Sequence, residues 1–68
     1  MKLTNFLFYD KSDDTETSVR CESFDTALIL FCKSFDLFYI VESIAEGIPD
    51  EYGFPTVHIQ GYSTLEKG

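Results

Sequence analysis

Histidine, cysteine and basic residues are scarce in this chain of 68 residues, and tryptophan is absent. The single histidine, His58, has no local motif for activating a nucleophile, and its neighbours predict a surface position on a strand. The two cysteines, Cys21 and Cys32, match neither a CxxC redox pair, a zinc-ligand spacing nor a disulfide framework, so free thiols in a reducing cytoplasm are expected. The glycine-rich phosphate-binding motifs GxGxxG and GxxxxGK(S/T) are also missing. The sequence therefore predicts no enzyme, no catalytic residue, no metal and no cofactor.

Long apolar runs are lacking as well. No run approaches the ~18 residues of a membrane span, and the start MKLTNFLFYD has no signal-peptide cleavage site. Only 5 Lys and Arg oppose 12 Asp and Glu, which gives a net charge of −7. Such a field repels phosphates and anionic lipids, so we expect no direct binding to nucleic acid or membrane, and a protein partner with a basic surface instead. Solubility alone is the other explanation of the charge.

Aromatic residues, by contrast, are abundant. Seven Phe and four Tyr make the chain 16% aromatic, and it is 44% hydrophobic overall. Each ring can bury ~150–250 Å², which is how one core could stabilise a chain near the lower size limit for independent folding. We therefore expect a single domain over residues 1–68.

Residues 3–10 and 15–22 are predicted to form a hairpin. The segment LTNFLFYD is rich in strand formers, TETSVRCE alternates between two faces, and KSDD between them has the residues of a turn. The acidic run DKSDDTE lacks the sixth-position Gly and twelfth-position Glu of an EF-hand calcium loop. It indicates a solvated turn.

A helix is predicted over about residues 23–35. Ser23 is a favourable N-cap, and Asp25 in the first turn complements the helix dipole. An apolar stripe at helical spacing follows, formed by Phe24, Ala27, Leu28, Phe31 and Phe35.

Residues 38–47 have two possible structures. A longer helix would end at Gly47, but the run Phe38–Val41 consists of β-branched and aromatic residues that lose rotamer freedom in a helix. The turn segment PDEYG and the alternating TVHIQGY behind it predict instead a hairpin of 38–47 with 55–63. The strand interpretation is favoured.

These elements predict an α+β fold of order ββαββ, with one helix packed on a four-stranded, mostly antiparallel sheet. Residues 63–68 are expected to be a frayed tail. The helical connection predicts that the second and third strands run parallel as neighbours or near neighbours. The tips of the two hairpins would then lie at opposite ends of the sheet.

One helix covers only one face of a sheet, yet the first and third strands are apolar on both faces. A sheet with one solvated face should alternate apolar and polar residues. We assign Leu7, Tyr9, Tyr39 and Val41 to the uncovered face and expect it to bind a partner or a second copy in a homodimer. The alternative is a sheet that curls and buries both sides.

Acidic side chains gather on both predicted hairpins, and we expect them to bind the partner. Carboxylates can take the place of phosphates in the basic channel of a nucleic-acid enzyme. If the two hairpin tips lie at opposite ends of the sheet, these acidic side chains form two separate groups rather than one continuous stripe. The residues are Asp10, Asp13, Asp14 and Glu16 on the first hairpin, and Glu46, Asp50 and Glu51 on the second.

In its shortness, acidity, aromatic content and ββαβ-type layout, the chain resembles the small bacteriophage-encoded proteins that block host or defence enzymes, including anti-CRISPR and anti-restriction proteins. The resemblance is one of type over the whole chain and transfers no individual positions. It implies a non-catalytic, stoichiometric inhibitor of a bacterial nucleic-acid-processing complex, acting in the host cytoplasm. The other expectation is a structural or adaptor module that self-associates through the uncovered sheet face.

Overall fold

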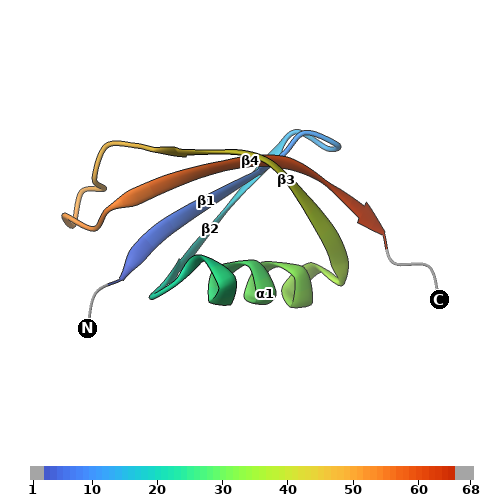
Figure 1. Ribbon diagram of the computed structural model, residues 1–68, viewed down its shortest axis with the longest axis horizontal. Coiled ribbons are helices and arrows are strands. Elements are labelled where there is room, and N and C mark those ends of the chain that lie inside the picture. The colour runs from blue at the N-terminus through green and yellow to red at the C-terminus, as the bar shows by residue number, and fades with distance from the viewer. Residues whose placement is uncertain (1–2, 66–68) are drawn as a thin grey trace.

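One helix lies against one face of an arched four-stranded sheet (Figure 1). The structure is a computed structural model and describes residues 3–65. The elements are β1 (Thr4–Asp10), β2 (Thr15–Cys21), α1 (Phe24–Phe35), β3 (Leu37–Glu46) and β4 (Thr56–Leu65). The predicted α+β class and ββαββ order are confirmed. β4 includes residues 63–65, which we had expected in a frayed tail, and residues 66–68 lie outside the described range.

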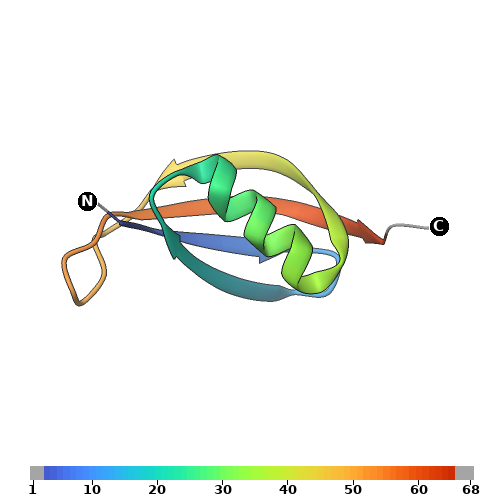
Figure 2. The ribbon, with the colours of Figure 1, turned by 90° about the horizontal axis from the view of Figure 1, so that it is seen from below.

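The sheet has the order β2-β1-β4-β3, with β1 and β4 paired in parallel at its centre. It is therefore mixed, and the expectation of a mostly antiparallel sheet is wrong. β2 and β3 run in the same direction, but they are the two edges rather than neighbours, and α1 crosses the sheet obliquely between them (Figure 2). The central positions go to β1 and β4 because these strands supply the most deeply buried apolar side chains of the sheet, Phe6, Phe8 and Ile59.

Both ends of α1 are specified by single residues. Ser23 is the N-cap, and its hydroxyl accepts the backbone N–H of Thr26 at 3.2 Å. Asp36 adopts the left-handed conformation with φ 53° and donates its N–H to the carbonyl of Cys32, which is a helix-ending arrangement. The chain therefore leaves the helix after Phe35 and enters β3, so the strand interpretation of residues 38–47 is confirmed.

The core is organised around three rings that join β1, α1 and β3. The rings of Phe8 and Phe31 stack with centroids 4.7 Å apart, and Tyr39 meets both edge-on at 5.6 and 5.1 Å. The Tyr39 hydroxyl donates to the backbone carbonyl of Tyr9. Burial, together with nearby carboxylates, raises the pKa of Tyr39 to about 12, so the hydroxyl keeps its proton at neutral pH.

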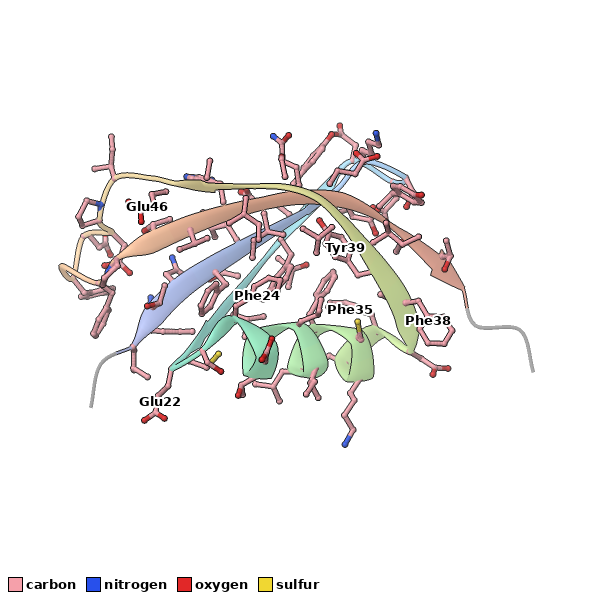
Figure 3. The ribbon with its side chains drawn as sticks, viewed as in Figure 1. Glu22, Phe24, Phe35, Phe38, Tyr39 and Glu46 are labelled. Carbon is pink, nitrogen blue, oxygen red and sulfur yellow. The ribbon has the colours of Figure 1, made fainter. Side chains whose placement is uncertain are left out.

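The assignment of Tyr39 and Val41 to the open face is wrong. Tyr39 points from β3 into the space between sheet and helix, whereas Phe38 lies outside it (Figure 3). The turn at Asp36 determines which residues of β3 face the helix, because Leu37 packs against the core and so do Tyr39 and Val41. Phe38 and Ile40, 54% and 43% exposed, take the open side of β3.

A β-bulge between Val41 and Ser43 then changes the alternation of β3. Beyond it Ile44, paired with Ile59, returns to the helix side, and Ala45 takes the open side. On the open face of β1, Leu7 and Tyr9 are half-buried. The open face is thus partly apolar, but exposed Gln60 and His58 in β4 interrupt it. The thiols of Cys21 and Cys32 are free and pack half-buried against the core.

Replacing Gly61 by Ala is expected to destabilise the protein. A Cβ at Gly61 would collide with the backbone carbonyl oxygen of Ile40 in the neighbouring strand and would approach the Tyr39 ring. Overpacking against backbone costs about 1–3 kcal/mol, to be measured as the free energy of unfolding in urea. Gly47→Ala is the control, because the colliding atoms there belong to the exposed His58 ring, which can rotate away. Equal losses in the two variants would contradict this account of the strand contact.

Candidate functional site

The predicted acidic residues occupy two opposite ends of the sheet. The turn at residues 11–14 lies at one end and the loop at residues 47–55 at the other (Figure 1). We call these the first-hairpin end and the 47–55 end. Their separation follows from the parallel pairing of β1 with β4. This pairing places the start of β4 beside the start of β1, so the 47–55 loop lies at the far end of the sheet from the turn that follows β1. The structure therefore brings the acids together as two groups rather than one.

At the 47–55 end, the carboxylate of Asp50 is occupied within the fold. It accepts the backbone N–H groups of Tyr52 and Phe54 at 2.9 and 3.0 Å and forms an ion pair with Arg20 at 3.4 Å. The Arg20 guanidinium also lies over the rings of Tyr52 and Phe54, 5.7 and 5.2 Å from their centroids. Asp50 thus fixes the loop against β2, and Glu51 remains exposed beside it.

Two further carboxylates lie at the same end. Glu46 is exposed at the end of β3, and Glu22 lies near the start of α1 (Figure 3). Nothing among residues 3–65 holds either carboxylate in one orientation by a hydrogen bond or ion pair. The 47–55 end therefore combines one structural acid with loosely held ones.

At the first-hairpin end, Asp10 is buried and only 3% exposed. Its Oδ1 accepts the N–H and the hydroxyl of Ser12 at 3.0 and 2.6 Å, and the N–H of Ser63 at 3.0 Å. Burial raises the pKa of Asp10, but these hydrogen bonds outweigh burial and leave the pKa below its ordinary value. Asp10 is therefore an ionised carboxylate that ties the turn to β4.

Asp13 and Asp14 are exposed, but both are held by neighbouring hydroxyls. Asp14, in the left-handed conformation with φ 56°, accepts the Tyr9 hydroxyl at 2.6 Å, and Asp13 accepts the Thr15 hydroxyl at 2.7 Å. The hydrogen bond and charge of Asp14 raise the pKa of Tyr9. Since Tyr9 is on the open face and Thr15 on the helix face, the two carboxylates lie on opposite sides of the turn. Glu16, also exposed, is paired with Tyr9 on the open face.

Few cations neutralise this end. Among residues 3–65 the ion pairs are Lys11 with Glu42 at 2.7 Å and Arg20 with Asp50. None of the four acids of the first hairpin takes part in either. Asp36, at the C-cap of α1, adds a further exposed carboxylate at this end. Lys11 in the turn and Lys33 in the last turn of α1 also lie at this end, but its carboxylates outnumber them, so the local field is negative.

A cavity of about 170 Å³ opens between the first hairpin and the end of α1, and sequence reasoning did not find it. Its existence depends on the sheet order, since segments from β1, β2, α1 and β3 meet there only because the helix crosses from one edge to the other. The one available signal was Asp10 itself, which continues the helix-facing series of Phe6 and Phe8 in place of another apolar residue. The cavity is lined by Asp10, Asp13, Thr15, Thr17, Phe31, Phe35 and Leu37.

Comparison of the chain with protein-family models, with curated proteins and with solved structures finds no match. Over residues 3–65, no group of three or more His, Cys, Asp or Glu side chains is placed to hold a metal ion. Within the same range no helix is long and apolar enough to cross a membrane. What the first-hairpin end can do is therefore inferred from its own residues.

Asp10→Asn is expected to lower the free energy of unfolding at pH 7 by about 1–3 kcal/mol, because three hydrogen bonds to a charged acceptor are weakened. A carboxyl whose pKa is lower in the folded state stabilises the fold above its unfolded pKa, and the effect is lost as pH falls through the folded pKa. The difference between wild type and variant should therefore shrink below about pH 4.

Urea unfolding from pH 7 to pH 2 checks this. Asp13→Asn is the control, because its exposed carboxylate accepts only a side-chain hydroxyl. A wild-type advantage over Asp10→Asn that stays constant down to pH 2 would show that the charge of Asp10 does not stabilise the fold.

Proposed function

We propose that this protein is a non-catalytic protein-binding module that inhibits a bacterial nucleic-acid-binding or defence enzyme stoichiometrically by occupying a basic surface of it. The observation that supports this is the first-hairpin end, where three exposed carboxylates and one buried carboxylate belong to one hairpin and no base of the described chain is ion-paired with any of them. A basic protein surface is the complement of such an end.

The hydroxyl partners of Asp13 and Asp14 favour recognition over mere solubility. A solubilising carboxylate needs no fixed orientation, whereas these two are each held within 2.7 Å by a neighbouring hydroxyl. Ordering a side chain on binding costs about 0.5–1.5 kcal/mol. A turn whose acidic side chains are already ordered avoids part of this entropic cost, so its electrostatic attraction to a basic surface gives a higher affinity.

The type of target follows from the charge. Proteins that bind nucleic acid carry basic surfaces built to accept rows of phosphates. A turn with several fixed carboxylates can compete for such a surface, and the resemblance to phage-encoded inhibitors points to bacterial enzymes as the class. On this proposal the protein acts in the bacterial cytoplasm, without turnover and in a fixed ratio to its target.

Affinity capture tests the proposal. The immobilised protein is expected to retain a basic, nucleic-acid-binding protein from nuclease-treated bacterial lysate at about 0.05 M salt and to release it towards 1 M, where the screening length falls to ~3 Å. The double variant Asp13→Lys, Glu16→Lys should reduce capture at least about tenfold, because like charges then face each other. Asp14 is left unchanged, since its left-handed backbone suits Asp or Asn.

The matched control is Glu22→Lys with Glu51→Lys, which changes the net charge equally but at exposed positions of the 47–55 end. It should keep most of the captured protein. If both double variants lose capture to the same extent, the interaction depends on overall charge and the first-hairpin end has no special role. If purified target keeps full activity when saturated with the protein, the inhibitor function is wrong.

A second candidate function, self-association, is favoured by one observation. β3 is an edge strand whose Phe38 and Ile40 are exposed on the open face. Exposed apolar edge strands pair readily with other chains. Sedimentation at rising concentration should then show a dimer, and Ile40→Lys should abolish it because a charge would be buried in the interface.

Leu30→Lys is the control, because Leu30 is exposed to a similar extent, 45%, on the helix. High salt should leave the dimer intact or strengthen it, unlike the capture described above. A wild-type protein that stays monomeric at the highest concentration measured would exclude this candidate.

A further inference from the structure

The cavity at the first-hairpin end has two chemically different sides. One side is apolar and aromatic, formed by Phe31, Phe35 and Leu37, and the other carries carboxylates and hydroxyls. Its volume of about 170 Å³ is below the ~300–1,000 Å³ of sites for small molecules and cofactors. A cavity of that size suits a single side chain of a partner.

We propose that this cavity receives an arginine side chain of the partner protein, with the guanidinium beside the Asp10 and Asp13 carboxylates and against the Phe35 ring. The inference rests on the proposed function and names how the basic partner is recognised. The proposal is supported by three features that lie together in the cavity. They are an apolar wall for the methylene stem of arginine, a flat ring for its guanidinium plane, and carboxylate oxygens for its N–H donors.

Asp10 makes the cavity selective for a cation. All three of its hydrogen bonds within residues 3–65 go to Oδ1, and Oδ2 accepts none there. Asp10 is 3% exposed and lines the cavity, so a cation placed there can donate a charge-assisted hydrogen bond to the unoccupied Oδ2. Asp13, which is exposed, supplies a second negative group at the mouth.

The end of α1 adds to this field. Phe35 is the last residue of the helix, so the negative end of the helix dipole lies at the cavity wall. Asp36 immediately beyond carries another exposed carboxylate. Lys33 in the last turn is the one base of α1, and no ion pair joins it to these acids. The cavity is thus a negatively charged site, and no Lys or Arg among residues 3–65 forms an ion pair with its carboxylates.

Arginine fits this site better than lysine. The hydroxyls of Thr15 and Thr17 and the two carboxylates offer several acceptors around one cavity, and a guanidinium presents five donors in a plane, whereas an ammonium has three and keeps its water more strongly. Phe35 is 53% exposed, and the centroid of its ring lies 5.5 Å from that of Phe31. Its exposed ring offers a face on which the guanidinium plane can stack.

The test uses three capped peptides, acetyl-Gly-Gly-X-Gly-Gly-amide, where X is arginine, lysine or citrulline, the neutral isostere of arginine. Each is titrated into the ¹⁵N-labelled full chain at low salt. The arginine peptide should shift the amide signals of the cavity residues saturably. Lysine should bind more weakly, and citrulline about tenfold more weakly or not at all, as expected when a charge-assisted hydrogen bond is lost. Equal binding of citrulline and arginine would overturn the proposal.

Variants locate the binding. Phe35→Ala and Asp13→Asn should each weaken binding of the arginine peptide several-fold. Leu30→Ala, at a similarly exposed position of the same helix, and Glu51→Gln at the other end should not. The unfolding curve of each variant is recorded, so that loss of the fold is not mistaken for loss of the site. Weakening by Glu51→Gln as large as by Asp13→Asn would show that the peptide follows net charge rather than the cavity.

The arginine site and the inhibitor function can fail separately. If a target is captured through the first-hairpin end but Phe35→Ala leaves its affinity unchanged and the arginine peptide does not bind, the arginine site is wrong and the proposed function stands. If the arginine peptide binds selectively but no basic protein is captured, the cavity assignment stands and the proposed function is wrong.

Discussion

The stack of Phe8 and Phe31, closed by Tyr39, is the contact on which the rest of the structure depends. It joins the central strand β1, the helix and the edge strand β3 through rings whose centroids are 4.7 to 5.6 Å apart. Because Phe31 is anchored there, the last turn of α1 extends beyond the stack and Phe35 is left half covered. Because Tyr39 is anchored there, Phe38 and Ile40 must face outward. The exposure of these apolar side chains is therefore a consequence of how the three core rings pack.

Acidity at the first-hairpin end follows from the same geometry. Phe6, Phe8 and Asp10 succeed one another on the helix side of β1, so the core gives way to a carboxylate where the helix ends. Asp10 stabilises the turn through Ser12 and Ser63 and at the same time gives the cavity its charge. At the opposite end, Asp50 is neutralised by Arg20. None of the four acids assigned to the first hairpin is ion-paired, whereas one of the three assigned to the second, Asp50, is paired with Arg20. This asymmetry is what directs the proposed function to one end.

Local patterns in the sequence predicted the helix and strands well, but they could not predict which distant strands pair with each other. The Ser23 cap, the helical stripe and the PDEYG turn are contained in a few residues each, so the helix and both hairpins were predictable. The parallel pairing of β1 with β4 joins segments about fifty residues apart and leaves no local pattern. The faces of Tyr39 and Val41 depended on where Asp36 ends the helix, so these two residues were assigned to the wrong face, and the bulge after Val41 changes the alternation again. The cavity was missed for the same reason, since it exists only when four elements meet.

The central claim is that the protein meets its target with the first-hairpin end. Hydrogen–deuterium exchange of the protein, free and bound to its captured target, measures this most directly. The account predicts slower exchange on binding for residues 10–17 and for the helix end at 35–37, with the loop at 47–55 unchanged. Protection confined to β3 and the open face of β4, with the first hairpin exchanging as in the free protein, would contradict it.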